Sequence, residues 1–191
     1  FTFDKNQKYA IIGESGSGKS TVLKMILGRL IPKKGAVLVD DKPLDTAKDI
    51  DFSKEIAYVS QDNYLFNLSI RDNITLGEDI SDEKIMDAIR EVRVDHLVNS
   101  LENGLDTFVG ALGGQLSGGE KQRICLARAL VRDLPVIILD EATSAVDNET
   151  RQEIEDIILS KDNKTIIMIS HHLEESTKAK LDKIYEIKKI S

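Results

Sequence analysis

The stretch Gly13–Thr21 has the residue types and spacing of a phosphate-binding loop, or P-loop. It fits the pattern G-x-x-x-x-G-K-[ST] and consists of Gly13, Glu14, Ser15, Gly16, Ser17, Gly18, Lys19, Ser20 and Thr21. Glycines permit a tight turn whose backbone N–H groups point at phosphate oxygens, and a following helix adds partial positive charge. We expect Lys19, exposed at the loop, to reach the outer phosphates, and the Ser20 hydroxyl to hold Mg²⁺. The alternative is an ordinary glycine-rich turn, which the apolar flanks on both sides disfavour.

Two acids that follow an apolar run form the second candidate. Val136–Leu139 indicates a buried strand, and Asp140 and Glu141 come directly after it. In a chain with a P-loop, we expect Asp140 to hold Mg²⁺ and Glu141 to act as the general base toward an attacking water. The alternative is that the two acids merely solvate the end of a strand.

The third candidate lies at a predicted helix start and consists of Leu116, Ser117, Gly118, Gly119 and Glu120. Ser117 and Glu120 have the S-x-x-E spacing of a capping box, which predicts a helix running through Val131. A serine and two glycines at a helix N-terminus can also form a second anion site. From these residues alone, a well-capped helix and a site for a second nucleotide both stay open.

Continuous apolar runs predict the strands that must position these residues. They cover residues 9–12, 36–39, 56–59, 136–139 and 165–169. Runs without polar alternation suit a parallel sheet that helices cover on both faces. From 69 to 131 the pattern becomes helical, and a further helix is predicted around Ile154–Ile158.

We therefore expect an α/β fold in one domain over residues 1–191. Residues 1–68 and 132–191 would form a P-loop NTPase core, with a mostly parallel sheet flanked by helices. Residues 69–131 would form an inserted α-helical subdomain. Phe1–Phe3 alternates like a strand in progress and no Met precedes it, so we also expect a piece of a longer chain.

Composition limits the classes of function. The 191 residues carry a net charge of -7, which argues against a nucleic-acid partner. One cysteine, Cys125, excludes an intramolecular disulfide framework and favours a reducing, cytoplasmic setting. Cys125 falls inside a predicted helix, where we expect it to pack. No apolar run approaches the roughly 20 residues that a membrane helix needs.

The order of these motifs carries a resemblance to a family. Leu116–Arg123, with the sequence LSGGEKQR, closely resembles the signature motif of the ATP-binding cassette (ABC) ATPases. The P-loop, Gln61, the signature, the Asp140–Glu141 pair, Ser144–Asp147 and His171 follow in the family's order over nearly the whole chain. The stretch from Tyr58 to Ile74 is similar to the exporter branch. The family's adenine-stacking aromatic residue, which lies upstream of the P-loop, has no match here.

The resemblance implies a role for each matching residue. Gln61 would touch Mg²⁺ and the water and would sense a transmembrane partner. Leu116–Glu120 would bind the γ-phosphate of ATP held by a second subunit, mainly through its serine and glycines. Ser144, Ala145, Val146 and Asp147 would form the D-loop, which joins the two sites. His171 would contact the γ-phosphate and complete a catalytic set with Lys19 and Glu141.

The resemblance thus implies the ATPase module of an ABC exporter, with ATP and Mg²⁺ as cofactors. Its partners would be a second ABC ATPase subunit and a separate transmembrane domain, at the cytoplasmic side of the cell membrane. Two alternatives remain: a soluble ABC ATPase not linked to transport, and a module that binds ATP without hydrolysing it.

Overall fold

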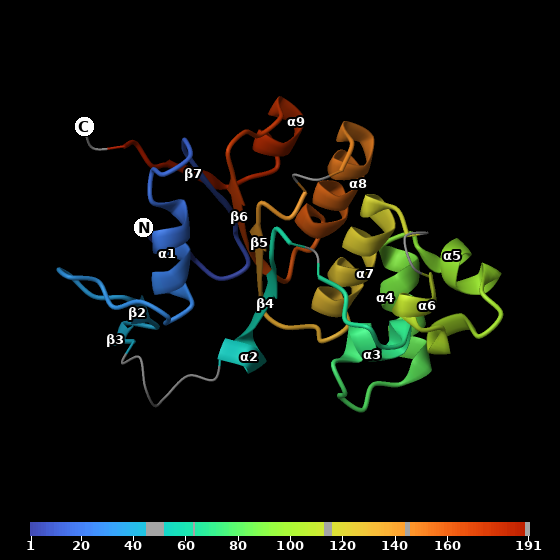
Figure 1. Cartoon of the computed structure of the whole chain (residues 1–191). Helices are drawn as coiled ribbons and strands as arrows, with labels where there is room; N and C mark the ends of the chain where they lie inside the picture. Colours follow the sequence, from blue (N-terminus) through green and yellow to red (C-terminus); the bar gives the residue numbers. More distant parts are fainter. Residues whose placement is uncertain (45–51, 63, 113–115, 144–145, 190–191) are drawn as a thin grey trace.

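The computed structural model describes residues 1–44, 52–62, 64–112, 116–143 and 146–189. Its centre is a five-stranded sheet with the order β4-β5-β6-β1-β7, in which all neighbours are parallel (Figure 1). The strands are β1 (Lys8–Ile12), β4 (Ile56–Val59), β5 (Val136–Asp140), β6 (Thr165–Ser170) and β7 (Lys183–Glu186). A separate antiparallel hairpin joins β2 (Leu38–Val39) to β3 (Lys42–Pro43).

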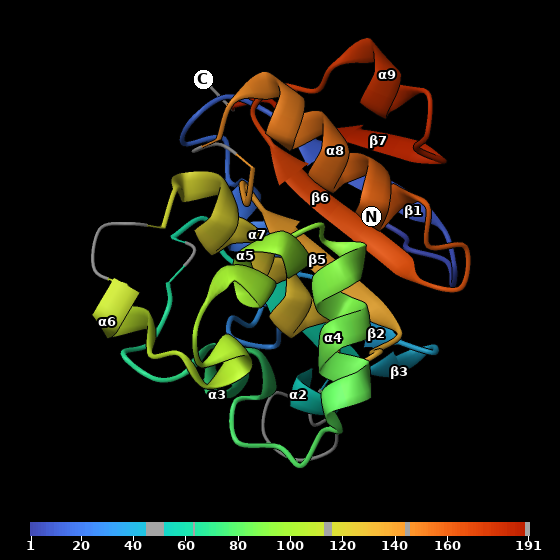
Figure 2. The same cartoon turned by 90° about the vertical axis from the view of Figure 1, so that its right-hand side faces the viewer.

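Helices cover both faces of this sheet. Helix α1 (Lys19–Ile26) packs on one face, and α7 (Gly118–Leu130) and α8 (Asn148–Leu159) pack on the other (Figures 1 and 2). Ile137 belongs to the core beneath α7 and α8, whereas its neighbour Ile138 belongs to the core beneath α1. Because successive strand residues point to opposite faces, both must be apolar, which explains the continuous runs in the sequence.

The remaining helices lie mostly beyond α7, on the side away from α1 (Figure 1). They are α2 (Phe52–Glu55), α3 (Ile70–Thr75), α4 (Asp82–Glu91), α5 (Asp95–Ser100), the 3₁₀ helix η1 (Gly104–Asp106), α6 (Val109–Leu112) and α9 (Glu175–Lys178). Helices α3 to α7 all fall within the range 69–131, and the described strands all fall outside it. Cys125 lies inside α7 and is buried. The fold class is the predicted one: an α/β sheet flanked by helices.

Two of the predicted strand segments are wrong, one wholly and one in part. Phe1–Phe3 forms no strand, because the backbone N–H of Thr2 donates to the Tyr185 hydroxyl and both phenylalanine rings pack against the Tyr185 ring. The run 36–39 contributes only Leu38–Val39, and both residues are exposed in the hairpin. These apolar residues therefore do not extend the central sheet.

No helix in the described ranges is long and apolar enough to cross a membrane.

Candidate nucleotide-binding site

Several residues that the sequence predicts to bind nucleotide or act in catalysis lie at the ends of parallel strands. Gly13 follows β1, Gln61 comes shortly after β4, Asp140 ends β5 and His171 follows β6. Since these strands run in the same direction, their carboxyl ends meet at one edge of the sheet. In open α/β sheets, this edge is where ligands bind.

Glycines shape the loop between β1 and α1. Gly16 and Gly18 have φ angles of 77° and 107°, in the region that favours glycine. At Gly13, an added Cβ would lie 2.4 Å from the Ile187 carbonyl oxygen and 2.7 Å from Ser17 Oγ. The tail after β7 thus packs directly against the start of the loop. Ser20, the second residue of α1, is exposed.

Lys19 corrects one expectation. We expected an exposed side chain, but Lys19 is only 5% exposed. Its Nζ folds back over the loop and donates to the carbonyl oxygens of Gly13 (2.8 Å) and Glu14 (3.1 Å). The loop carbonyls converge on the ammonium and bury it. The positive charge is therefore already positioned at the centre of the loop.

His171 connects Lys19 to Glu141. Its Nδ1 lies 3.1 Å from Lys19 Nζ, and its Nε2 lies 2.8 Å from Glu141 Oε1. His171 Nδ1 also lies 3.2 Å from the Gly13 carbonyl oxygen, and the tautomer of the ring sets whether Nδ1 donates or accepts. The three proposed catalytic residues thus lie in one continuous series of contacts.

Glu141 is held in an unusual backbone conformation. Its φ angle is 48°, in the left-handed region that non-glycine residues seldom adopt. Its backbone N–H donates to the Ile169 carbonyl oxygen at 2.9 Å, and this bond attaches the turn after β5 to strand β6. Such conformations cost energy and often occur at functional sites.

Asp140 has a partner that the sequence analysis missed. The Tyr58 hydroxyl donates to Asp140 Oδ2 at 2.8 Å. Burial, reinforced by this hydrogen bond, raises the pKa of Tyr58 above its usual value, so the hydroxyl stays protonated as a donor at neutral pH. Tyr58 stands three residues before Gln61, but only the pairing of β4 with β5 shows that its hydroxyl reaches Asp140.

The oxygen donors at this edge suit Mg²⁺. In the described part of the chain, no three His, Cys, Asp or Glu side chains lie together as in a metal site made of protein ligands alone. Magnesium sites with phosphate ligands commonly use only one or two carboxylates, together with phosphate oxygens and water. The Asp140 carboxylate and the Ser20 hydroxyl fit that kind of site. Gln61 is exposed in the turn after β4, and its metal role stays a prediction.

The signature motif lies on another element. Ser117 caps α7 by the predicted capping box: its Oγ accepts from Glu120 N (3.2 Å), and Glu120 Oε2 accepts from Ser117 N (2.7 Å). Leu116 is buried, Gly118 is exposed and Gly119 is half-buried at the helix start. The sheet separates α7 from α1 (Figure 1), so the signature and the P-loop helix of one chain lie on opposite faces.

An open groove runs beside the signature. Its lining residues are Arg93, Val94, His96, Ser117, Gly119, Glu120, Arg123, Thr150 and Glu153. His96, which matched no motif, is one of them. Arg93 and Arg123 both pair with Glu153, at 3.1 and 2.5 Å.

The structure describes only part of the predicted D-loop. Ser144 and Ala145 lie outside the described residues, and Val146 directly precedes Asp147. Asp147 is the N-cap of α8, with its carboxylate accepting from Thr150 N at 2.9 Å, and this bond lowers the pKa of Asp147. The sequence analysis gave Asp147 no capping role, although aspartate is a preferred residue at the N-cap of a helix.

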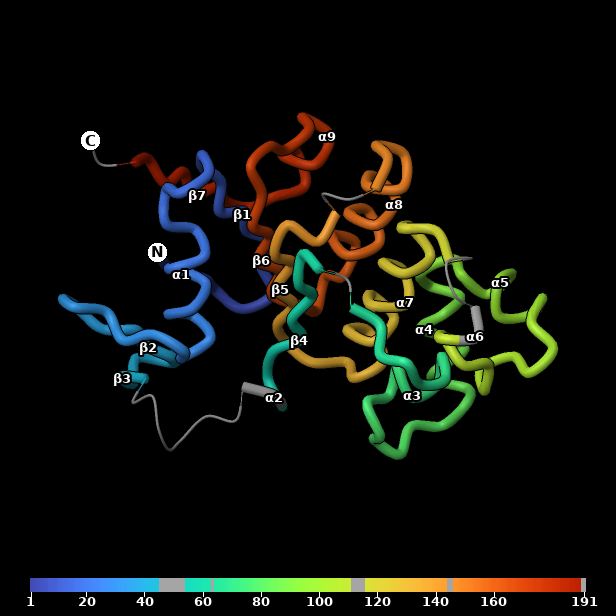
Figure 3. The backbone as a smooth tube through the Cα atoms, viewed as in Figure 1, coloured from blue at the N-terminus to red at the C-terminus, as the bar shows by residue number. Residues whose placement is uncertain are grey.

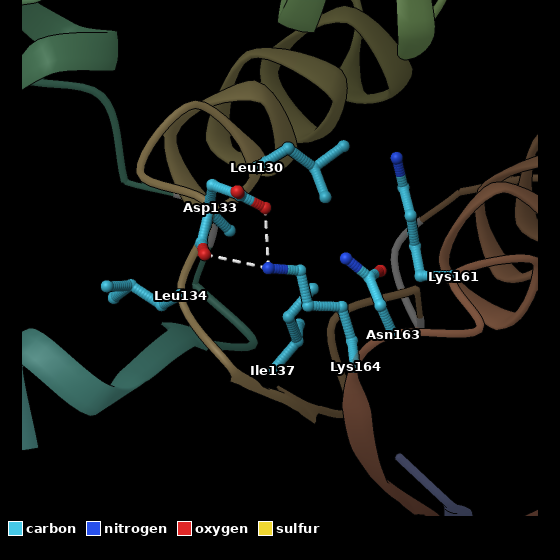
Figure 4. A pocket seen from close by; sticks show the side chains of 8 residues that line it. Leu130, Asp133, Leu134, Ile137, Lys161, Asn163 and Lys164 are labelled. Carbon is cyan, nitrogen blue, oxygen red and sulfur yellow. Dashed lines mark hydrogen bonds and ion pairs between the residues drawn. The ribbon is translucent and has the colours of Figure 1, made fainter.

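A second cavity lies near the amino ends of β5 and β6 (Figure 4). Lys164 points across it and donates to the Asp133 carbonyl oxygen at 2.7 Å, and it pairs with the same residue's carboxylate at 2.5 Å. These contacts join the residue before β6 to the segment before β5 across the cavity. It lies at the opposite end of the strands from the candidate site.

Comparison with known proteins places the chain in a family. Residues 1–144 match the family model described as ABC transporter. The chain is 41% identical over 187 residues to the ATP-dependent lipid A-core flippase of Alcanivorax borkumensis, covering 96% of this chain and 32% of the flippase. It is 39% identical over 175 residues to antigen peptide transporter 2 of Homo sapiens, covering 91% of this chain and 25% of that protein.

A solved structure shares the fold. A bacterial Atm1-family ABC exporter with ATP bound matches with a TM-score of 0.86 at 34% identity, covering 100% of this chain and 34% of that chain. The chain thus spans about a third or less of the length of its curated relatives. On these matches and the motifs above, the chain belongs to the ABC transporter family and corresponds to the nucleotide-binding module of an exporter.

Proposed function

We propose that this chain binds ATP with Mg²⁺ and hydrolyses it to ADP and phosphate, and that a dimer of such modules drives a transmembrane domain. The observation that carries the proposal is the chain of contacts from Lys19 through His171 to Glu141, at the carboxyl edge of the sheet. It joins a phosphate-binding cation to a carboxylate that can accept a proton.

Each residue has a distinct chemical task in hydrolysis. Lys19 and the loop N–H groups would hold the β- and γ-phosphates, exchanging the loop carbonyls for phosphate oxygens. Glu141 would take a proton from the attacking water, and the Nε2–H of His171 would orient its carboxylate. When bound, Mg²⁺ would neutralise phosphate charge, with Asp140 and Ser20 as the residues that hold it. Gln61, next to Asp140 at the strand ends, would help to place the water.

The position of the signature supports a dimer. Ser117 begins α7 on the face of the sheet opposite α1, so it is poorly placed to serve the P-loop of its own chain. Residues Leu116–Glu120 would instead meet the γ-phosphate bound by a second subunit. The segment 144–147 would cross between the two sites.

An exposed apolar patch supports the membrane partner. Tyr64, Phe66, Leu68 and Phe108 are 42 to 64% exposed. The first three follow shortly after Gln61, and Phe108 lies on a later segment that pairs with Ser69. Large apolar side chains gathered on a surface mark interaction sites. We propose that the transmembrane domain docks here, and that the module works at the cytoplasmic side of the membrane.

Phosphate release tests the enzymatic part. The chain should release phosphate from ATP in a Mg²⁺-dependent reaction, and Glu141→Gln should slow it by about 10²–10⁴-fold, the range that positioned acid–base groups contribute. Glu102→Gln, which changes an exposed residue of the same type away from the site, should keep the parent rate. If the parent binds ATP but releases no phosphate, the module only binds nucleotide.

A further inference from the structure

We propose that Tyr58 is a positioning residue for the metal-binding carboxylate: its hydroxyl holds Asp140 Oδ2 and thereby presents Oδ1 to Mg²⁺. This inference rests on the proposed function, since it concerns the metal requirement of the same site. It adds a residue that neither the motifs nor the comparisons assign.

The strand register brings the two side chains together. Tyr58 on β4 lies opposite Ile138 on β5, and Asp140 follows Ile138 by two residues. Residues two apart on a strand share a face, and a diagonal neighbour across a strand pair is within reach of an aromatic side chain. Ile138 packs beneath α1, so the Tyr58 hydroxyl and Asp140 lie on the face that carries the P-loop helix. The hydrogen bond between them measures 2.8 Å.

The chemistry of the donor suits a metal ligand. A tyrosine hydroxyl is neutral, so it orients the carboxylate without cancelling its charge as a lysine or arginine would. In the part of the chain that the structure describes, no Lys, Arg or His forms an ion pair with Asp140. Outer partners that fix a ligating carboxylate strongly influence metal affinity. Tyr58 therefore leaves Asp140 both oriented and negatively charged.

A purely structural role accounts poorly for this contact. The Tyr58 side chain is 37% exposed, and Tyr58→Phe retains the ring that packs. What the substitution removes is one hydroxyl whose described acceptor is the Asp140 carboxylate. The substitution should therefore spare the fold and act on the metal.

The experiment separates nucleotide binding from metal binding. A fluorescent ATP analogue is titrated into the chain in EDTA, and then Mg²⁺ is titrated at fixed analogue concentration. Tyr58→Phe should leave the metal-free nucleotide Kd within about twofold, and should raise the Mg²⁺ concentration at half-maximal effect by about tenfold, the lower range for loss of an outer partner. Excess Mg²⁺ should then restore the parent's binding.

A matched control is available in the same chain. Tyr9 also donates its hydroxyl to an aspartate, Asp4 Oδ2 at 3.2 Å, but at the opposite end of β1 from Gly13. Tyr9→Phe should leave the Mg²⁺ dependence unchanged. The proposal is overturned if Tyr58→Phe keeps the parent's Mg²⁺ dependence, or if it weakens metal-free binding equally. A parent chain that binds nucleotide without any response to Mg²⁺ would overturn the proposed metal site as well.

Discussion

Lys19 stabilises the loop that it serves. Its ammonium donates to two carbonyl oxygens, Gly13 O and Glu14 O, and so adds to the Ser17 N–H on Glu14 O and the His171 contact of Gly13 O. A bound phosphate would compete for the same ammonium. The lysine thus has a structural task without nucleotide and a binding task with it.

Lys19→Met should therefore reduce both nucleotide affinity and stability. Removing the ammonium takes a charged donor away from both carbonyls, although Glu14 O keeps the Ser17 N–H, and hydrogen bonds to charged groups contribute roughly 1.5–3 kcal/mol. Urea unfolding without nucleotide measures this cost, and an ATP titration measures the lost affinity. Lys24→Met, an exposed lysine on the same helix, is the control. Equal unfolding midpoints for Lys19→Met and the parent would show that the carbonyl contacts contribute nothing.

The residue scale also shows what the sequence could and could not predict. The P-loop and the capping box at Ser117 were predictable because their contacts join residues a few positions apart. The burial of Lys19 was not, because it depends on how the loop carbonyls converge. The Tyr58–Asp140 bond was not either, since 82 positions separate the two residues and only the strand register brings them together.

At the scale of the element, the Asn73 side chain joins helix α3 to the segment that carries most of the apolar patch. Its Oδ1 accepts from Phe66 N (2.8 Å), and its Nδ2 donates to Phe66 O (2.9 Å) and Ser69 O (3.0 Å). Arg128 of α7 donates to the backbone oxygens of Asn73 and Tyr64. One end of α7 carries the signature and the other end holds the patch, so the helix links the two surfaces.

Asn73→Ala should loosen the patch. It removes the acceptor of the Phe66 N–H, whereas Phe66 O keeps the Leu68 N–H, and the expected loss in unfolding free energy is roughly 1–3 kcal/mol. Hydrogen exchange should report faster exchange at the Phe66 amide, ahead of global unfolding. Asn99→Ala, an exposed site on α5, should change neither quantity. Unaltered exchange at Phe66 would mean that other contacts hold this segment.

Helix α8 provides a test that separates capping from the D-loop role. Since the folded state lowers the pKa of Asp147, the charged form stabilises the fold above the ordinary value of 3.8, and this contribution is lost as pH falls through the lowered pKa. Asp147→Asn retains an Ncap acceptor but does not titrate. Its unfolding midpoint should lie slightly below the parent's at pH 7, and the difference should vanish in acid.

Dimer formation by the same variant decides the second role. If Asp147 only caps α8, Asp147→Asn should still dimerise with ATP, whereas Asp147→Ala should lose stability at every pH. Loss of dimer in the well-folded Asn variant would support a D-loop role across the interface.

Whether a strand could be predicted from the sequence depended on how deeply that strand is buried. The apolar runs at 9–12, 56–59, 136–139 and 165–169 lie in β1, β4, β5 and β6, because strands covered on both faces admit few polar residues. Strand β7, with the sequence KIYE, went unpredicted. It lies at the edge of the sheet and is largely exposed, so its residues carry no continuous apolar signal.

At the scale of the whole molecule, Glu141→Gln should trap an ATP-bound dimer. Gln keeps the shape of Glu but cannot accept a proton, so the γ-phosphate would remain as the bridge between Lys19 of one subunit and Ser117 of the other. Sedimentation should show a dimer with ATP and a monomer with ADP. A monomer at saturating ATP would remove the two-subunit site from the proposal.

Ser117→Arg provides the complementary test in the Glu141→Gln background. The larger charged side chain at the start of α7 should block dimer formation but leave ATP binding by the monomer intact, because the P-loop lies across the sheet. Loss of monomer binding would indicate that Ser117 acts on the site of its own chain.

The placement of β1 sets the order in which the site can assemble. Both of its neighbours, β6 and β7, come from the far end of the chain: Lys8 lies opposite Ile166, and Tyr9 lies opposite Lys183 (Figure 3). A ribosome adds β1 and the P-loop before it adds residues 165–186, so the strand has no sheet partner until those residues have emerged. Its apolar residues stay unpaired while the intervening residues are synthesised, a state prone to aggregation. The phosphate-binding loop is thus synthesised well before the strands that hold its sheet together.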